Sequence, residues 1–240
     1  MTEALLSKLI PFVLTRPTRA SIGFWSSLSP NVQNVLDPVV SPLVEIVPLQ
    51  PEDSFPQTDA VVFSSANGAQ HGPPGDGRPA FCVGEATTKA ASNRGWSAVQ
   101  TGQTADDVVR KLSKGDARPS LLHLSGQHTR GDLVGRLSDA GFRAHHTIVY
   151  DQVLQPLSSE AINRMKAAET SLVPLFSPRT AAHFSRQNVR PESTHLIVMS
   201  RSVALALENL PFASVTIAEQ PTAHAMRDAT QTWLKSHASG

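Results

Sequence analysis

The chain has 240 residues, which is long for one compact core and sufficient for two smaller ones. Apolar residues make up 40% and charged residues 17% of the sequence, a composition that excludes a disordered protein. The formal net charge is +1, so the strongly basic surface of a typical nucleic-acid-binding protein is not expected.

Seven short apolar runs occur along the sequence, each about as long as a buried strand. Their hydrophobicity is continuous rather than alternating, which is typical of parallel strands covered by helices on both faces. In chain order, the predicted strands are residues 12–15, 60–64, 80–83, 121–124, 172–176, 195–199 and 214–218.

Amphipathic stretches with helical spacing lie between these runs and predict helices. One stripe covers 105–112 after Thr104, a candidate N-cap, and another covers 133–140 and stops at Gly141. Further stripes cover 161–168, after Ser158-Ser159, and 223–233, after Pro221-Thr222.

Two extended segments with internal or following prolines, 39–49 and 147–154, interrupt this alternation and bracket residues 50–146. The sequence therefore predicts an α/β protein with two doubly wound parallel-sheet domains of the flavodoxin or Rossmann type. Residues 1–38 and 155–240 would form one discontinuous domain and residues 50–146 an inserted domain. The two extended segments would form a two-stranded linker.

Residues 68–79 contain four glycines and three prolines, a composition that predicts a loop with at most one helical turn. A surface loop without a role and a loop at the edge of a binding cleft are both open interpretations.

In open α/β sheets, ligands bind beyond the carboxyl ends of the strands. Small hydroxyl residues, glycine and arginine follow the predicted strands, where they either cap the next helix or help its free N–H groups to bind anions. The candidate binding residues are Thr15, Arg16, Pro17, Ser64, Ser65, Asn67, Gly84, Thr87, Ser125, Gly126, Ser177, Pro178, Arg179, Thr180, Ser200 and Thr222.

Several kinds of chemistry find no support in the sequence. No G-x-G-x-x-G follows the first strand, and no P-loop or G-x-S-x-G elbow is present, so nucleotide cofactors, NTPase and hydrolase activities are not expected. The histidines, including His123 and His145-His146, lack ligand spacing and are expected at the core edge or in solvent, without a metal. The single cysteine, Cys82, lies in an apolar run and is expected to be buried. No run approaches the ~18 apolar residues of a membrane span, and a cytoplasmic protein is expected.

Eight motifs together resemble those of the uroporphyrinogen-III synthase family in type and order, between about residues 12 and 234. They include Thr15-Arg16-Pro17, Ser64-Ser65-Ala66-Asn67, Gly84-Glu85-Ala86-Thr87, Ser125-Gly126, Val149-Tyr150 and Ser177-Pro178-Arg179-Thr180. The resemblance implies a lyase of tetrapyrrole biosynthesis that cyclises hydroxymethylbilane to uroporphyrinogen III. Water is lost, ring D is inverted and no cofactor is used. The segment 68–79 departs from the family pattern, in which a helix is common.

The resemblance also implies site roles and partners. Tyr150 would contribute to proton donation, or else be a buried linker residue whose hydroxyl bonds a backbone carbonyl. Arg16, Arg130, Arg179 and Arg201 are candidates for the substrate carboxylates, although Arg16 could equally be a surface charge. The expected partner is the linear tetrapyrrole, with a monomeric protein and a transient contact with the preceding pathway enzyme. The alternative function is a non-catalytic, two-lobed tetrapyrrole-binding or regulatory module.

Overall fold

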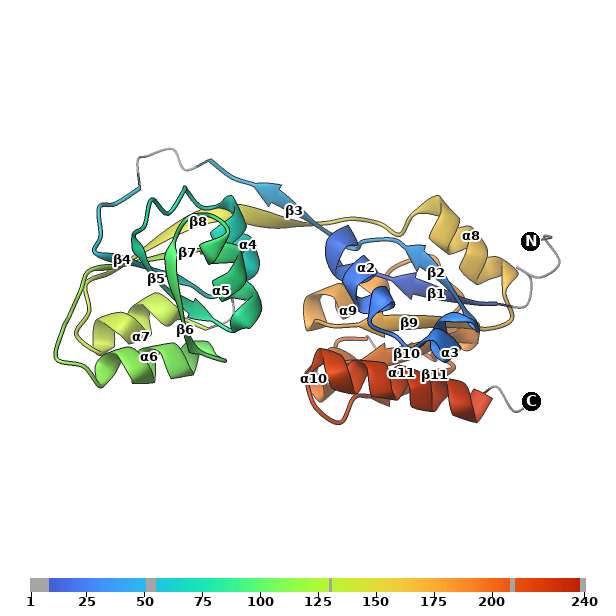
Figure 1. The fold of residues 1–240 in the computed structure, drawn as a ribbon. Helices are drawn as coiled ribbons and strands as arrows, with labels where there is room; N and C mark the ends of the chain where they lie inside the picture. The colour runs from blue at the N-terminus through green and yellow to red at the C-terminus, as the bar shows by residue number, and fades with distance from the viewer. Residues whose placement is uncertain (1–8, 51–54, 130, 208–209, 238–240) are drawn as a thin grey trace. The chain divides into compact units, whose positions relative to one another are not determined.

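The computed structural model describes residues 9–50, 55–129, 131–207 and 210–237. The chain divides into two compact units: unit 1 is Met1–Glu45 with Leu154–Gly240, and unit 2 is Ile46–Val153. Each unit contains a largely parallel sheet with helices on both faces, so the predicted fold class is confirmed (Figure 1). None of the described helices combines the length and apolar character that crossing a membrane requires.

The sheet of unit 1 is doubly wound. β1 (Ile10–Leu14) pairs in parallel with β2 (Leu36–Val40) on one side and with β9 (Ser171–Leu175) on the other. β10 (Thr194–Val198) and β11 (Ser214–Ile217) continue beyond β9, giving the order β11-β10-β9-β1-β2. The direction of winding therefore reverses between β1 and β9, and this switch point is where α/β sheets bind ligands.

Alternate residues of the unit 1 strands pack on opposite faces of the sheet. Val13 contacts the core formed with α8 (Ser159–Ala167), α9 (Pro178–Phe184) and α10 (Arg201–Leu205). Its neighbours Phe12 and Leu14 contact the core formed with α2 (Thr18–Ser26), α3 (Pro30–Gln33) and α11 (Ala223–His237). Because both faces are buried, the strands have continuous apolar sequences.

Unit 2 repeats this scheme with the order β3-β8-β7-β4-β5-β6. From β4 (Ala60–Phe63) the sheet grows to one side through β5 (Pro79–Val83) and β6 (Ser97–Gly102). On the other side lie β7 (Leu121–Gly126) and β8 (Ala144–Leu154), also parallel. The switch point of unit 2 therefore lies between β4 and β7. β6, which the sequence did not predict, is an edge strand.

The helices of unit 2 also cover both faces of its sheet. α4 (Ala66–His71) and α5 (Glu85–Ser92) pack on the face that holds Phe63 and Cys82. α6 (Ala105–Ser113) and α7 (Leu133–Asp139) pack on the face that holds Val62. Cys82 is fully buried, as predicted.

Helix ends follow the predicted capping signals. The Thr104 hydroxyl accepts from the N–H of Asp107 while the Asp107 carboxylate accepts from the N–H of Thr104, a complete capping box on α6. Ser158 caps α8 by accepting from the N–H of Ala161. Gly141 follows α7 with a φ of 87°, a conformation that favours glycine.

The chain passes between the two units in two extended segments that hydrogen-bond to each other. The N–H of Leu49, next to β3 (Val44–Pro48), donates to the Val149 carbonyl at 3.0 Å, and the N–H of Gln155 donates to the Leu43 carbonyl at 3.0 Å. These pairings run antiparallel. The segment 39–49 contains the end of β2 as well as β3, and 147–154 is the second part of β8.

The prediction of a loop over residues 68–79 is wrong for its first four residues, which belong to α4. The hydroxyl of Ser65 accepts from the N–H of Gly68 at 3.1 Å and caps this helix. A Cβ at Gly68 would lie 2.5 Å from the Leu124 carbonyl oxygen, so glycine is required for α4 to lie against β7. The prolines begin at Pro73, after the helix has ended.

The close approach at Gly68 predicts a measurable difference between two glycine substitutions. Gly68→Ala should lower the free energy of unfolding by about 1–3 kcal/mol through overpacking. Gly23→Ala is the matched control, because Gly23 lies in α2 with nothing within 4 Å of a new Cβ. It should raise the free energy of unfolding by up to about 1 kcal/mol. Urea unfolding of both variants measures the difference, and equal effects would contradict the packing argument.

Candidate active site

The switch point of unit 1 carries a half-buried guanidinium group. The Thr15 hydroxyl donates to the Pro174 carbonyl at 3.3 Å and joins the carboxyl ends of β1 and β9. The next residue, Arg16, places its guanidinium carbon 4.6 Å from the ring centroid of Phe176, a cation–π contact. Burial lowers the pKa of Arg16, but an arginine remains charged at neutral pH. Arg16 is therefore a fixed cation at the switch point rather than a freely solvated charge.

The residues after β9 combine a helix cap with a second arginine. The Ser177 hydroxyl accepts from the N–H of Thr180 at 3.2 Å and bonds the Thr180 hydroxyl at 2.8 Å, capping α9, with Pro178 in the first turn. Arg179 follows in the same turn, and its buried Nη1 has no hydrogen-bond partner in the described protein. Two guanidinium groups thus stand after neighbouring strands.

The remaining unit 1 candidates follow the next two strands of the sheet. Ser200 begins α10 and its hydroxyl bonds that of Ser202 at 2.9 Å. The Thr222 hydroxyl accepts from the N–H of Ala225 at 3.2 Å. Arg201 is exposed, and Arg130 lies outside the described residues. Because β11, β10, β9 and β1 are neighbours in that order, their carboxyl ends form one continuous edge.

The switch point of unit 2 holds two serine–histidine pairs. Ser64, directly after β4, bonds His123 Nε2 at 2.8 Å, and Ser125, in β7, bonds His146 Nε2 at 2.7 Å. The two imidazole rings stack with their centroids 5.4 Å apart. His123 is only 5% exposed, so the expectation that it lies at the core edge or in solvent is wrong.

Both rings of this stack favour the neutral form. Burial, with a smaller effect of His146, lowers the pKa of His123 to about 4. Burial also lowers the pKa of His146, partly opposed by the nearby Asp132 carboxylate. Each neutral ring has one N–H donor and one acceptor nitrogen, and the pairing serine can take either role.

Tyr150 lies on the opposite face of the same sheet, beside Ser65. Its hydroxyl is 3.1 Å from the Ser65 hydroxyl, so its partner is not a backbone carbonyl. Tyr150 is 4% exposed and its ring lies against Gly126, where a Cβ would come within 2.5 Å of two ring atoms. His71 of α4 approaches from the other side, with ring centroids 6.0 Å apart. Glycine at 126 is thus required for the position of the phenol.

Three further candidates have mainly structural positions. Gly84 precedes α5 with a φ of 75°, and its N–H donates to the Gly102 carbonyl at 2.8 Å. Asn67 lies in the first turn of α4. Thr87 is buried in the first turn of α5, directly after Gly84, and stays a prediction as a binding residue.

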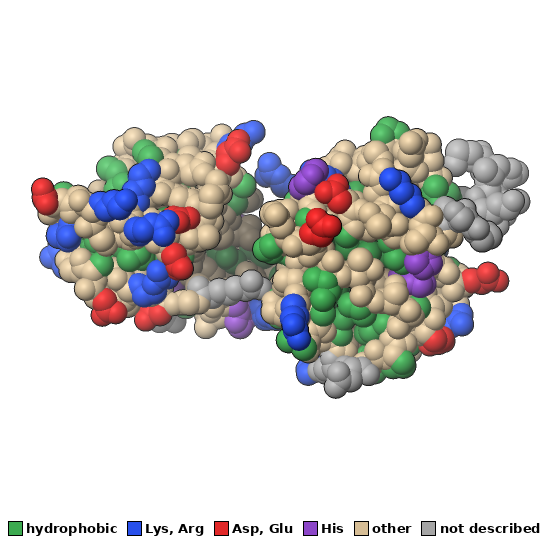
Figure 2. Space-filling model, turned by 90° about the horizontal axis from the view of Figure 1, so that it is seen from below, with side chains coloured by type: hydrophobic (Ala, Val, Ile, Leu, Met, Phe, Trp, Pro, Cys, Tyr) green, Lys and Arg blue, Asp and Glu red, His purple; other side chains and the backbone are tan. Residues whose placement is uncertain are grey.

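An open groove of about 360 Å³ in unit 2 is lined by the second half of edge strand β6 and by α6 with its flanking residues. Lys and Arg side chains gather together with Asp and Glu on the face that carries α6 and α7 (Figure 2). Arg110 pairs with Asp107 within the groove, so part of its charge is neutralised. Among the described residues, no group of three His, Cys, Asp or Glu side chains is arranged to hold a metal ion. The groove lining is Gln100, Thr101, Gly102, Gln103, Asp107, Arg110, Lys111 and Lys114.

Comparison with known families identifies the family of the chain. The family model for uroporphyrinogen-III synthase HemD matches residues 32–228, which is most of the chain. The chain belongs to the uroporphyrinogen-III synthase family. No curated protein sequence matches it at a significant level.

Solved uroporphyrinogen-III synthases also resemble this chain in structure. The crystal structure of the Helicobacter pylori enzyme superposes with a TM-score of 0.67 at 18% identity, covering 94% of this chain and 99% of the other. A mutant enzyme from the extremely thermophilic bacterium Thermus thermophilus gives a TM-score of 0.49 at 13% identity, covering 96% and 100%. At 18% identity, the structural similarity to the Helicobacter pylori enzyme shows that this chain has the same fold.

Sequence reasoning placed most of the synthase's strand-end residues but missed the two histidines. The signal was present, because His123 is the single polar residue inside the buried run 121–124. A lone polar residue in a buried strand needs a hydrogen-bond partner. Which partner it has depends on the register between strands, and no sequence pattern specified that register.

The lowered pKa of His123 predicts a pH-dependent stability of the synthase. Its folded-state pKa of about 4 lies below the ordinary 6.5, so the unfolded state binds more protons between these values. Stability is therefore lost as the pH falls through this window. From about pH 7 to about pH 4.5, His123 should account for a fall of roughly 2.5 kcal/mol in unfolding free energy.

Urea unfolding at both pH values measures this fall. His123→Gln has no ring to protonate and should show a correspondingly smaller fall. The same fall in the wild type and in the variant would mean that other groups carry the pH dependence.

Proposed function

We propose that this chain holds hydroxymethylbilane through the strand ends at the switch points of its two sheets. The activity that goes with its family is closure of this linear tetrapyrrole to uroporphyrinogen III, with loss of water and inversion of ring D. The substrate bears carboxylates on every pyrrole ring, so it needs hydrogen-bond donors and cations along its length. The switch points supply both kinds of group, from arginines in unit 1 and hydroxyls in unit 2.

The observation that carries this proposal is the buried, unpaired Nη1 of Arg179. A buried donor of a charged group is destabilising unless it finds an acceptor. Arg16, after the neighbouring strand, adds a second cation whose position is set by the Phe176 ring. A carboxylate of the substrate provides the missing acceptor and balances the charge. Bidentate contact with a guanidinium would also orient the pyrrole that carries it.

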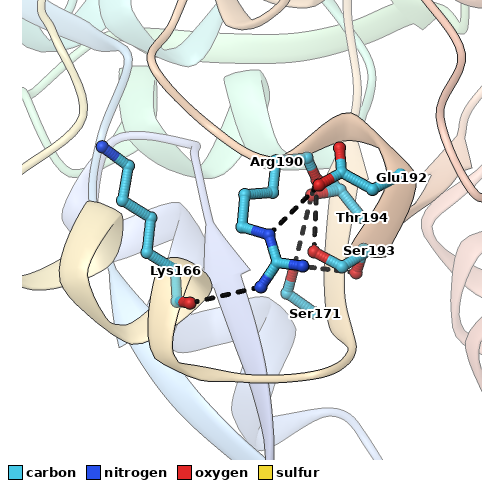
Figure 3. A network of polar contacts seen from close by, with 6 residues as sticks. All are labelled: Lys166, Ser171, Arg190, Glu192, Ser193 and Thr194. Atoms are coloured by element: carbon cyan, nitrogen blue, oxygen red, sulfur yellow. Dashed lines mark hydrogen bonds and ion pairs between the residues drawn. The ribbon is translucent and has the colours of Figure 1, made fainter.

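Arg190 shows the opposite arrangement, at the amino-terminal end of β10. Its Nε contacts the Glu192 carboxylate at 3.1 Å and its Nη1 donates to the Lys166 carbonyl at 3.4 Å (Figure 3). Ser193 and Thr194 donate to the Arg190 carbonyl. This guanidinium is satisfied within the protein and serves structure. Arg179 and Arg190 therefore differ in availability, because of these two only Arg179 has a buried donor without a partner in the described protein.

Catalysis in this proposal is mainly positioning, with help for the leaving hydroxyl. Loss of the terminal hydroxyl as water leaves a cation on one end of the substrate. The pyrrole at the far end attacks this cation through its substituted carbon to give a spiro intermediate, whose rearrangement inverts ring D. The ends must be held together, which is a contribution of orientation. Tyr150, bonded to Ser65, contributes a proton to the departing hydroxyl, and a phenol is only a weak acid.

The product isomer tests the function directly. Purified protein and freshly generated hydroxymethylbilane should yield mainly the type III isomer after oxidation and separation of the uroporphyrins. Spontaneous closure gives type I. Tyr150→Phe should still give type III, with a loss in kcat smaller than the ~100-fold typical of an essential general acid. Type I alone from folded wild-type protein would favour the non-catalytic tetrapyrrole-binding alternative.

The role of Arg179 predicts a selective defect in substrate binding. Arg179→Gln should raise KM roughly 10- to 100-fold, the value of a hydrogen bond to a charged group. Its melting temperature should not fall, because no protein contact of Nη1 is lost. Arg190→Gln is the matched control, with the same charge change in the same unit, and its KM should stay within about twofold. A similar KM for both variants would remove Arg179 from the binding site.

Oligomeric state and partner contacts are part of the same proposal. We expect the synthase to work as a monomer and to meet the preceding pathway enzyme only transiently. Sedimentation of the protein alone, and then of an equimolar mixture with that enzyme, measures both expectations.

A further inference from the structure

The two serine–histidine pairs of unit 2 have the same geometry on adjacent strands. In each pair, the histidine bonds a serine two residues beyond its own cross-strand partner. Val62 of β4 pairs with His123 of β7, and the ring of His123 reaches diagonally to Ser64, two residues after Val62 and directly after β4. His123 in turn pairs with His146 of β8, whose ring reaches diagonally to Ser125, two residues further along β7. Diagonal neighbours of this kind are about 7–8 Å apart at the backbone, a span that an imidazole can bridge.

This repeat lies on one face of the sheet, at the switch point. Side chains alternate between faces along a strand, so Ser64 shares the face of Val62, and Ser125 that of His123. Ser65 and Tyr150 lie on the other face, with α4. The hydroxyls of Ser64 and Ser125 therefore lie at the ends of the two adjacent strands between which the winding reverses. They take no part in the hydrogen bond between Ser65 and Tyr150.

The direction of the hydrogen bond is fixed for the second pair. The Ser125 hydroxyl donates to the Gly126 carbonyl at 3.2 Å, so its oxygen is left to accept from the ring of His146. The single hydrogen of the Ser125 hydroxyl is thus taken by Gly126. His123 is the one hydrogen-bond partner of the Ser64 hydroxyl among the described residues, so His123 Nε2–H as donor leaves the Ser64 hydrogen free. A hydroxyl that accepts from an imidazole is held as a donor, and a donor is the group that a carboxylate requires.

We infer that His123 is a positioning residue that holds the hydroxyl of Ser64 as a hydrogen-bond donor toward a carboxylate of the tetrapyrrole substrate. His146, fixed by Ser125, is a positioning residue that holds the His123 ring through the stack. The inference rests on the proposed function and deepens it, because it assigns the recognition of one substrate carboxylate arm to this face of unit 2. The stacking of the rings fixes the pair as a unit, so a change at one histidine also affects the other.

A double-mutant cycle between Ser64 and His123 tests this inference. Ser64→Ala should raise the KM for hydroxymethylbilane about tenfold with little change in kcat, because a single hydrogen bond to a charged group is lost. His123→Leu should have a similar effect. The double variant should be no worse than either single variant, because the histidine acts through the serine. His123→Gln should restore most of the wild-type KM, since its amide N–H can take the place of Nε2–H.

The same KM measurements on variants of His146, in β8, test the inference without a substitution at the buried His123. His146 is exposed, so His146→Leu and His146→Gln should fold even if His123→Leu does not. Adjacent His145, which is exposed on the other face of β8, provides the control: His145→Leu should leave KM unchanged.

An unchanged KM in Ser64→Ala or His146→Leu would overturn the inference. So would a double variant of Ser64 and His123 whose rise in KM equals the product of the two single rises. These results differ from failure of the proposed function, in which the wild type itself would form no type III isomer.

Discussion

The reversal of winding beside the first strand of each sheet is the constraint on which the rest of the structure depends. β1 in unit 1 and β4 in unit 2 each have a later strand on one side and the next strand in sequence on the other. The chain segments that follow the two strands beside the reversal leave the carboxyl edge of the sheet in opposite directions. The helices that these segments lead to do not cover the crevice between the two strand ends. Arg16 and the segment 177–180 flank the reversal in unit 1, and Ser64 and Ser125 flank it in unit 2.

Many of the polar groups at these edges have two roles. Ser65 caps α4 and also bonds the Tyr150 hydroxyl, while Ser177 caps α9 in front of Arg179. A capping interaction stabilises a helix by about 1 kcal/mol. The caps therefore secure the backbone next to the groups proposed to contact the substrate. Nη1 of Arg179 is the exception, since this buried donor has no hydrogen-bond partner in the described protein and is open to a ligand.

The sequence was most informative where both faces of an element are buried. The continuous apolar runs predicted seven strands because burial on two faces removes any alternation. Edge strand β6 was missed, since most of its residues are solvent-accessible and polar. α4 was missed because its glycine composition reflects a close contact with Leu124, which involves residues far apart in sequence. The site was predicted through its strand ends. The histidine pairs were not, because register and ring orientation are properties of packing.

The discontinuous chain path of unit 1 has a consequence for its synthesis on the ribosome. Unit 2 is contiguous and can fold as soon as it has emerged, whereas β1 must wait for β9, its partner on one side, at Phe12 and Leu172. At ~5–20 residues per second, roughly ten to thirty seconds separate the two strands. During that time Phe12, Val13 and Leu14 have only β2 and nearby helices to cover them. This short apolar segment is therefore incompletely covered until the second part of unit 1 has been synthesised.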